Sequence, residues 1–528
     1  MVRTGRNLLA AAIAVGLLGV GIAAATPVDV LTYHNDLART GQNLFETLLT
    51  PATVSPSTFG RVFTRIVDGF VYAQPLIVTG LDIPGKGTFD VVFVATENDT
   101  VYAFDASGAV TRALWRQRLI VPRSGGRAVT WREVGCNDLV PKIGVTSTPV
   151  IDRASGTLYV VAKTKERGKG NFVQRLHALD LATGAEKLGG PVAITASVPG
   201  SGDGSVGGMI AFDPLRQHQR SALALVNGVV YIGSASHCDI GPYHGWIIGY
   251  DASTLSRVSA FVTTPDGGLG GVWQSGGAPA ADDAGNLYVA TGNGTFDAQD
   301  GGSDYGDSLL KLQTTGGLSV ADYFTPFNQS DLDAADQDFG STAPLLLPDQ
   351  PGLHPHLALA SGKDGTIYVV DRDQMGQFHA GSDSQIVQSL PGAIAEGTFT
   401  MPAYWNGTVF YSGRADFVKA FALSSGLLST TPVAQSGDFF GFPGASLSIS
   451  ANDATGGIVW AIQTDGYANH RPAVLHAYAA ADISQTLYAS DQIRRDAAGR
   501  AAKFAVPTVA NGKVYVGGQN RLTAYGLR

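Results

Sequence analysis

The stretch ATGNGTFDAQDGGSDYGD, residues Ala290–Asp307, gathers side chains whose oxygens could bind a cation or accept a proton. It holds four Asp and five Gly within eighteen residues, and it follows NLYV, a run typical of a buried strand. A carboxylate beside an Asn side-chain oxygen suits a hard cation such as Ca²⁺. Taken alone, an Asp- and Gly-rich loop is more often a solvated turn, so the elements around it must decide.

Further polar side chains follow other predicted strands. Lys363 and Arg414 suit an anionic or quinone oxygen. Trp273 alone is more often core than a stacking surface, and histidines in a Gly- and Pro-rich loop more often pack or cap. The remaining candidates are His237, Cys238, Asp239, Tyr243, His244, Asp331, Asp333, Asp336, Asp338, Asp364, Arg372 and Asp416. The sequence contains no His-x-x-x-His, Cys-x-x-Cys-His or Gly-x-Ser-x-Gly motif, so transition-metal, haem and serine-hydrolase chemistry lack support.

One sequence pattern recurs eight times over residues 73–528, with about sixty residues per copy. The pattern has the form Pro, an apolar run, Gly and then a Val/Leu-Tyr-Val strand, as in STPVIDRASGTLYVVAKT. Asn-Gly pairs in VNGVV, WNGTV and ANGKV predict tight hairpin turns. Repeated small antiparallel sheets predict an all-β, eight-bladed β-propeller. A seven-bladed ring with one copy on the rim is the alternative.

The ends of the repeat region predict how the ring closes. The last copy stops at RLTAYGL, its third strand, whereas TFGRVFTRIV (Thr58–Val67) is a strand-like run without a partner of its own. We expect it to be the outer strand of the last blade, which removes the free sheet edges. An ordinary N-terminal arm is the other interpretation. The predicted domains are a signal peptide at 1–25, an N-terminal arm at 26–57 and one propeller at 58–528.

The N-terminus predicts export. Arg3 and Arg6 precede an apolar run from Leu8 to Ile22, and Ala23 and Ala25 have the spacing of a cleavage site after Ala25. The run is short for a membrane span and no second one follows. We therefore expect the mature protein to be periplasmic or secreted. In that compartment Cys136 and Cys238, the two cysteines of the chain, predict a disulfide, with two buried free thiols as the alternative.

Charge excludes one class of partner. Without Arg3 and Arg6 the chain has 34 basic and 44 acidic residues, a net charge of −10. Because phosphate binding needs a basic surface, we expect no nucleic-acid partner.

The repeat and the order of the candidate residues resemble the eight-bladed quinoprotein alcohol and methanol dehydrogenases, which use pyrroloquinoline quinone (PQQ) and Ca²⁺. The likeness implies that Asp239 in GSASHCDIG and Asn293 in ATGNG are Ca²⁺ ligands. It implies that Trp273 in GGVWQS supports the quinone, and that Lys363 in GKDGTIYVVDR contacts its oxygens. Asp307 in YGDSLLKL takes the place of the catalytic base, and DQDFGS looks like the acidic segment that follows it in the family.

The implied reaction uses these residues together. Ca²⁺ on Asp239 and Asn293 polarises a quinone carbonyl, Asp307 removes the substrate hydroxyl proton, and hydride passes to the quinone. Lys363 stabilises negative charge on the quinone oxygen.

The chain departs from the family pattern at several positions. The family has a pair of adjacent cysteines that bridge over the quinone, whereas Cys136 is followed by Asn137, so no such bridge can form. A bridge from Cys136 to Cys238 could cap the same pocket instead. The first Ca²⁺ ligand is Asp instead of Glu, and the family's repeated Trp motif is nearly absent, since the whole chain has only six Trp.

Three functions follow from these observations. The first is a PQQ- and Ca²⁺-dependent dehydrogenase acting on a small-molecule alcohol or sugar. The second is a non-catalytic propeller that has lost PQQ and binds a protein, a glycan or Ca²⁺ on its loop face. The third is a hydrolase or lyase using Asp and His. Convergence of Asp239, Asn293, Asp307 and Lys363 on one axial pocket walled by Trp273 would favour the first.

Overall fold

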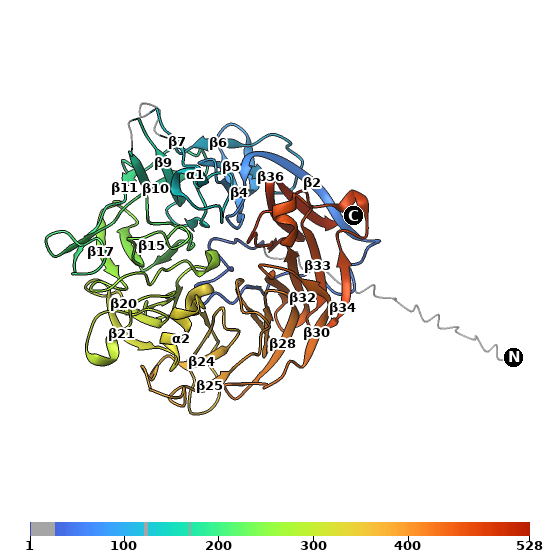
Figure 1. Cartoon of the computed structure of the whole chain (residues 1–528). Coiled ribbons are helices and arrows are strands. Elements are labelled where there is room, and N and C mark those ends of the chain that lie inside the picture. The colour runs from blue at the N-terminus through green and yellow to red at the C-terminus, as the bar shows by residue number, and fades with distance from the viewer. Residues whose placement is uncertain (2–26, 121–124, 168–169) are drawn as a thin grey trace.

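The computed structural model describes residues 1, 27–120, 125–167 and 170–528. The predicted signal peptide at 1–25 lies outside the described residues apart from Met1. Within them the chain forms a ring of eight antiparallel sheets, so the predicted eight-bladed propeller is confirmed and the seven-bladed alternative is wrong (Figure 1). No helix in the described part of the chain is both long and apolar enough to cross a membrane.

The first four blades follow one another along the chain, and each is built from consecutive strands. They are β3 (Leu76–Ile83), β4 (Gly87–Thr96), β5 (Thr100–Asp105) and β6 (Trp115–Arg118); β8 (Val150–Asp152), β9 (Thr157–Lys165), β10 (Phe172–Asp180) and β11 (Val192–Ala193), with β7 (Arg127–Ala128) also on β9; β14 (Ala224–Val226), β15 (Val229–Ser234), β16 (Trp246–Asp251) and β17 (Arg257–Val262); and β18 (Ala280–Ala281), β19 (Leu287–Ala290), β20 (Leu309–Gln313) and β21 (Ser319–Phe324).

The next three blades repeat this order. They are β22 (Leu345–Leu346), β23 (Leu357–Ser361), β24 (Ile367–Asp371) and β25 (Gln388–Leu390); β26 (Ala403–Trp405), β27 (Thr408–Ser412) and β28 (Asp416–Ser424), with β29 (Leu427–Leu428) and β30 (Ala434–Phe440) both on β28; and β31 (Ala445–Asn452), β32 (Thr455–Gln463), β33 (Val474–Ala479) and β34 (Asp482–Ala489). A small hairpin of β12 (Ser197–Pro199) and β13 (Met209–Ala211) stands apart from the blades.

The eighth blade joins the two ends of the chain. β35 (Thr508–Ala510) pairs with β36 (Lys513–Leu527), and β36 pairs with β2 (Phe59–Phe70). The β2–β36 register runs antiparallel, from Phe59 opposite Leu527 to Phe70 opposite Gln519. Figure 1 shows the blue strand β2 beside the red strand β36. The prediction that residues 58–67 close the last blade is therefore confirmed.

The turn chemistry follows the sequence closely. Each of three hairpins turns through an Asn-Gly pair in which both residues are left-handed: Asn227 and Gly228, Asn406 and Gly407, and Asn511 and Gly512. Two positive φ angles in succession define the two-residue turn whose twist matches paired strands.

The core lies between blades. Large apolar clusters each combine side chains of adjacent sheets; one joins the second and third blades through Tyr159, Leu176, Ile232 and Trp246. Both faces of the central strands are covered, so β23 and β24 are buried along their whole length. A single blade could not bury its faces, which is why the repeats must form a ring.

The N-terminal arm lies against the inner edges of the blades. Its backbone bonds to six first strands. Val30 exchanges two hydrogen bonds with Ile77, and five further arm carbonyls accept from strand N–H groups: Leu31 from Ile151, Leu37 from Ala281, Ala38 from Leu346, Thr40 from Tyr404, and Gly41 from Ile449. The arm continues into β1 (Gln42–Asn43), which pairs in parallel with β31. These bonds satisfy the inner strand edges, which would otherwise expose unpaired backbone groups.

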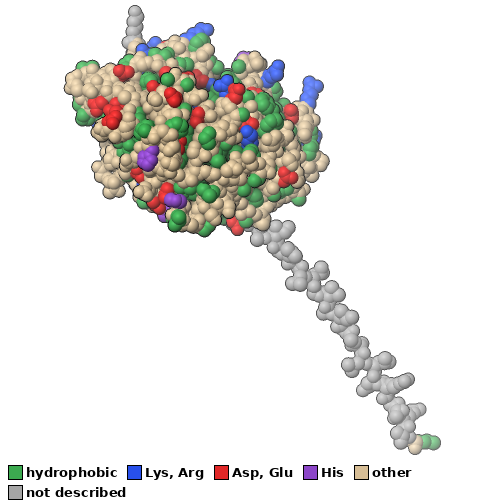
Figure 2. Space-filling view, turned by 60° about the horizontal axis from the view of Figure 1, so that its bottom comes forward, with side chains coloured by type: hydrophobic (Ala, Val, Ile, Leu, Met, Phe, Trp, Pro, Cys, Tyr) green, Lys and Arg blue, Asp and Glu red, His purple; other side chains and the backbone are tan. Residues whose placement is uncertain are grey.

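Tyr33 of the arm fills the axis at this level. It packs in one apolar cluster with a residue from each of five blades: Ala222, Ala278, Ala343, Met401 and Val506. We call this the sealed end of the axis, and the end where the loops gather around a cavity the open end. Over the outer surface in Figure 2, acidic, basic and apolar side chains are interspersed.

Candidate functional site

A cavity of about 240 Å³ lies at the open end of the axis. We call it the reactive chamber. Five predicted site residues line it, namely Cys136, Cys238, Asp239, Trp273 and Lys363. These residues come from the second, third, fourth and fifth repeats, so ring closure brings together positions separated by more than two hundred residues.

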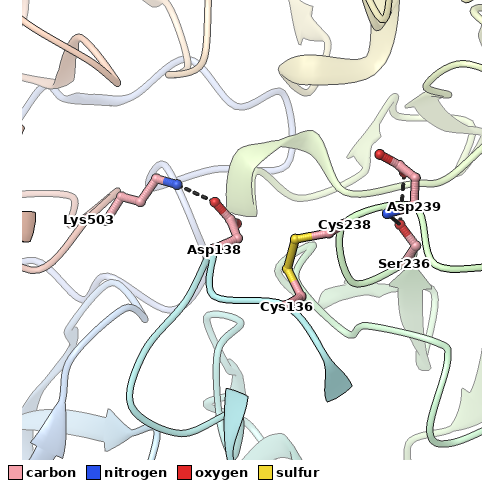
Figure 3. The surroundings of a disulfide bond; sticks show 6 residues. All are labelled: Cys136, Asp138, Ser236, Cys238, Asp239 and Lys503. Atoms are coloured by element: carbon pink, nitrogen blue, oxygen red, sulfur yellow. Dashed lines mark hydrogen bonds and ion pairs between the residues drawn. A yellow bond between two sulfur atoms is a disulfide. The ribbon is translucent and has the colours of Figure 1, made fainter. Parts of the chain in front are cut away.

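Cys136 and Cys238 form a disulfide, with Cα atoms 5.6 Å apart and a sequence separation of 102. The predicted disulfide is confirmed, and the alternative of two free thiols is wrong. Figure 3 shows the bridge between the segment that carries Asp138 and the loop that carries Asp239. Cys238 and Asp239 both have left-handed backbone, with φ of 49° and 52°. Consecutive non-glycine residues in this region are costly and are held in place by the surrounding structure.

Asp239 is held by its own loop. Its Oδ1 accepts hydrogen bonds from the hydroxyl of Tyr243 at 2.6 Å and that of Ser236 at 3.0 Å. The backbone N–H of Asp239 donates to the Ser236 hydroxyl at 3.0 Å. The carboxylate is thereby oriented, and its second oxygen has no hydrogen-bond partner among the residues that the structure describes.

Lys363 sits between two carboxylates and an indole ring. Its Nζ lies 2.6 Å from Asp338 Oδ2 and 2.8 Å from Asp336 Oδ1. The same nitrogen is 5.8 Å from the centre of the Trp273 ring, within cation–π range. Burial lowers the pKa of Lys363, but the two carboxylates outweigh it and raise the pKa above its ordinary value. Lys363 is therefore a fixed positive charge beside the indole.

Asp338 also lines the reactive chamber, although the sequence singled it out only as part of an acidic segment. Its Oδ1 accepts the backbone N–H of Asn293 at 2.9 Å, and its Oδ2 faces Lys363. Burial raises the pKa of Asp338, against the opposing effect of Lys363. A carboxylate that takes up a proton more readily than usual is suited to accept one from a substrate. The signal that could have found it was DQDFGS.

Asn293 lies behind Asp338 and does not line the chamber. Its side-chain amide donates to Asp336 Oδ1 at 3.0 Å. Its Oδ1 is buried and has no hydrogen-bond partner in the described part of the chain. Buried polar atoms are nearly always satisfied, so this oxygen can accept a further ligand.

Asp307 lies outside the chamber lining and is fully buried. Its Oδ1 accepts the backbone N–H of Phe339 at 3.0 Å, and its Oδ2 accepts a weaker bond from Gln329 at 3.4 Å. Burial raises the pKa of Asp307 well above its ordinary value. The side chain braces the backbone immediately after Asp338.

Two buried histidines form another wall of the chamber. The His218 and His237 rings stack with centroids 4.3 Å apart, and Lys163 Nζ lies 2.6 Å from His237 Nε2. Burial keeps the pKa of both imidazoles well below the ordinary value, so both are neutral. His244 instead bonds Thr264 and the Asp203 carbonyl, which is a packing role.

Charges of both signs surround the chamber. Its cations are Arg220, Lys363 and Lys503, and its acids are Asp138, Asp239 and Asp338. Lys503 pairs with Asp138, as Figure 3 shows. Arg220 is held by the carbonyls of Thr146 at 2.7 Å and Ser275 at 2.9 Å. No group of three His, Cys, Asp or Glu side chains is arranged to hold a metal within the described ranges.

No protein-family model and no curated protein matches the sequence. Solved structures do match. A quinohemoprotein alcohol dehydrogenase from Comamonas testosteroni is 16% identical, with 96% of this chain and 81% of that chain covered and a TM-score of 0.61. A europium-containing methanol dehydrogenase is 12% identical, with 95% and 98% covered and a TM-score of 0.59. The chain has the fold of the quinoprotein alcohol dehydrogenases.

A solved structure that is not named as a dehydrogenase also matches. The BamB structure from Moraxella catarrhalis is 13% identical, with 89% of this chain and 99% of that chain covered and a TM-score of 0.50. At these identities similarity shows the fold alone, so activity has to be argued from the residues of the chamber.

Proposed function

We propose that the chain is an exported dehydrogenase that binds PQQ and Ca²⁺ in the reactive chamber and oxidises an alcohol or sugar hydroxyl. The observation that carries the proposal is the meeting of Trp273, the Cys136–Cys238 disulfide, Lys363, Asp239 and Asp338 around one axial cavity. The disulfide also supports export, because such bonds persist in oxidising compartments.

The chamber suits a flat, anionic aromatic group. Trp273 offers an indole and the disulfide a second apolar surface, and both belong to the lining. PQQ is a planar ring system with carboxylates, for which cations in the lining are the expected partners. Lys363 lies nearest to the indole, and Arg220 and Lys503 complete the set.

The oxygen donors suit a hard cation. Asn293 Oδ1 is buried without a partner, and Asp338 accepts a hydrogen bond from the backbone of the same residue. The charge of Asp239 contributes to raising the pKa of Asp338, which places the two carboxylates within electrostatic range. Carboxylate and amide oxygens are the ligands that Ca²⁺ prefers. Asp239 and Asn293 remain the proposed ligands, with Asp338 beside them.

The residues then have distinct roles. When bound, the quinone supplies the electron sink that accepts a hydride equivalent. Asp338 accepts the proton of the substrate hydroxyl at its carboxylate, and Lys363 keeps that carboxylate oriented at 2.6 Å. The sequence predicted Asp307 as the base. Because Asp307 is fully buried and does not line the chamber, and because it accepts the Phe339 N–H, we assign it to holding the Asp338 segment in place.

Reconstitution tests the proposal. The purified mature chain is incubated with PQQ and Ca²⁺, and dye-linked oxidation of an alcohol and aldose panel is measured. We expect turnover that requires both additions. Saturated PQQ binding without oxidation of any substrate in the panel would contradict the enzymatic role.

A non-catalytic binding propeller is the second candidate. It is favoured by the internal pairing of the chamber's charges, since Lys363 already contacts Asp336 and Asp338, and Lys503 already contacts Asp138. A chamber whose charges are paired within the protein does not require an ionic ligand. This candidate predicts no saturable PQQ binding.

A further inference from the structure

A second cavity adjoins the reactive chamber. Its volume is about 560 Å³, and we call it the outer chamber. Asp138 and Lys503 line both cavities, so this ion pair stands at the boundary between them. The outer chamber lies among the loops of the second, seventh and eighth blades.

The boundary pair is held firmly on both sides. Lys503 Nζ lies 4.8 Å from the ring centres of Phe442 and Phe504 and 5.5 Å from that of Tyr467. Asp138 follows Cys136 by two residues and is thereby tied to the disulfide. The chambers therefore meet at a charged but internally neutral boundary.

Aromatic rings dominate the outer chamber. Phe70, Tyr72, Trp131 and Tyr467 all contribute to its lining. Two of their polar groups, the indole N–H of Trp131 and the hydroxyl of Tyr467, have no hydrogen-bond partner among the described residues. The Tyr72 hydroxyl, in contrast, donates to the Val140 carbonyl at 2.7 Å.

Polar groups without partners stand beside these rings. The exposed amide of Asn137 has no hydrogen-bond partner within the described ranges. His470 uses Nδ1 in a 3.0 Å contact with Gln519, which leaves its Nε2 available. Gln519 also donates to the Ala501 carbonyl at 2.8 Å, so it serves to position His470.

This combination selects a class of ligand. Aromatic faces pack against the C–H faces of a pyranose ring, and unpartnered N–H, O–H and C=O groups can bond its hydroxyls. The charges in the lining are already paired, so a neutral polyhydroxy compound is favoured over an ion. The outer chamber is also more than twice as large as the reactive chamber, which a small primary alcohol would not need.

We infer that the outer chamber is a saccharide-binding site that holds a pyranose ring with one hydroxyl directed past Asp138 and Lys503 into the reactive chamber. The oxidation of that hydroxyl rests on the proposed function, whereas binding of the ring does not. A free aldose and the terminal residue of a glycan share this chemistry.

Saturation-transfer NMR on the mature chain without PQQ tests the site. D-Glucose, maltotriose and butan-1-ol are compared as ligands at millimolar concentration. We expect transfer to the ring C–H protons of glucose or maltotriose, and little to butan-1-ol. A stronger signal from glucose would identify a free aldose as the ligand, and a stronger signal from maltotriose would identify a glycan end.

Variants tie the signal to the site. Trp131→Ala should weaken sugar binding about tenfold, since it removes an aromatic face. Tyr467→Phe and Asn137→Ala should weaken it about two- to fivefold and remove only polar groups. Tyr404→Phe, on the sixth blade, is the matched control and should leave binding unchanged. Asn137→Ala changes an exposed side chain, so it also serves if Trp131→Ala fails to fold.

The outcomes separate this inference from the proposed function. No transfer to either sugar, transfer that none of the three variants alters, or equal binding of butan-1-ol would overturn the saccharide site. Each of these results is obtained without the cofactor. If PQQ does not bind, the proposed dehydrogenase function is contradicted. A sugar signal that depends on Trp131 would still support the saccharide site.

Discussion

The two ends of the propeller axis are built from the same repeats, but one is closed by packing and the other surrounds a polar cavity. At the sealed end the arm bonds through its backbone to six inner strands, and Tyr33 packs among small or apolar side chains. At the open end the corresponding space holds carboxylates, ammonium groups, a guanidinium and a disulfide around a cavity. The difference suggests that stability is concentrated at one end, which allows the other to keep costly polar groups and strained backbone.

The largest expected effect is on turnover at the open end. Asp338→Asn removes the carboxylate that we propose as proton acceptor, so kcat should fall about 10²- to 10⁴-fold. PQQ binding and the thermal unfolding midpoint should change little. The measurement is dye-linked oxidation by the reconstituted variant.

Asp307→Asn is the matched variant for that experiment. Its side-chain oxygen can still accept the Phe339 N–H, so a smaller loss of kcat is expected. A greater loss for Asp307→Asn than for Asp338→Asn would restore Asp307 as the base.

The Cys136–Cys238 disulfide is an exception to this difference in stability, because we expect it to stabilise the open end. Cys136→Ala combined with Cys238→Ala frees a loop of 102 residues and should lower the free energy of unfolding by about 2–5 kcal/mol. It should also weaken PQQ binding, because both residues line the reactive chamber. Denaturant unfolding of the variant and the oxidised parent gives the first quantity. An unchanged unfolding midpoint would show that the bridge has no stabilising role.

Arg39 tests the sealed end. It is fully buried and donates to the Pro279 carbonyl at 2.7 and 3.0 Å and to the Tyr33 carbonyl at 2.9 Å. Arg39→Met leaves these acceptors without partners and should cost about 3 kcal/mol of unfolding free energy. PQQ affinity should be retained, as read by thermal unfolding with and without the cofactor.

The control for Arg39 is Arg153→Met, which breaks a half-exposed ion pair with Asp29 and should cost well under 1 kcal/mol. Equal losses for the two variants would remove the distinction between the ends.

The remaining prediction concerns the pH dependence of stability. Burial raises the pKa of Glu97 from 4.5 to about 7 in the folded chain. The folded state then holds this proton more tightly than the unfolded state does. Its stabilising contribution is complete below pH 4.5 and is lost as the pH rises through about 7. Glu97→Gln should therefore make the thermal unfolding midpoint less dependent on pH between about 4.5 and 7.

Glu396→Gln is the control for that series, because Glu396 forms an exposed pair with Arg414 and its replacement should leave the pH profile unchanged. A Glu97→Gln profile as steep as that of the parent would contradict the assignment.

The fold could be predicted because it depends on local sequence patterns. The repeat fixes the number of blades, Asn-Gly pairs fix hairpins, and the strand run at Thr58–Val67 lacks a partner of its own. The arm around the axis could not be predicted in the same way. Its bonds to Ile77, Ile151 and Ala281 are backbone bonds, which leave no side-chain signature in the sequence.

The candidate site could be predicted in part. Cys136, Cys238, Asp239, Trp273 and Lys363 stand at positions that ring closure brings to one cavity. The choice between Asp307 and Asp338 depended on the path of the chain between them, which leaves Asp338 in the chamber lining and buries Asp307 outside it. Both follow Gly- or Asp-rich turns, so residue type alone could not separate them.

The central claim is that the reactive chamber holds PQQ beside Trp273, and equilibrium binding tests it most directly. PQQ is titrated into the mature chain with and without Ca²⁺, and the quenching of tryptophan fluorescence is followed in the parent, Trp273→Phe and Lys363→Gln. The account predicts saturable binding of one PQQ per chain, tighter with Ca²⁺, with less quenching in Trp273→Phe and affinity about tenfold or more weaker in Lys363→Gln. Quenching that never saturates, or that is the same in all three proteins, would contradict it.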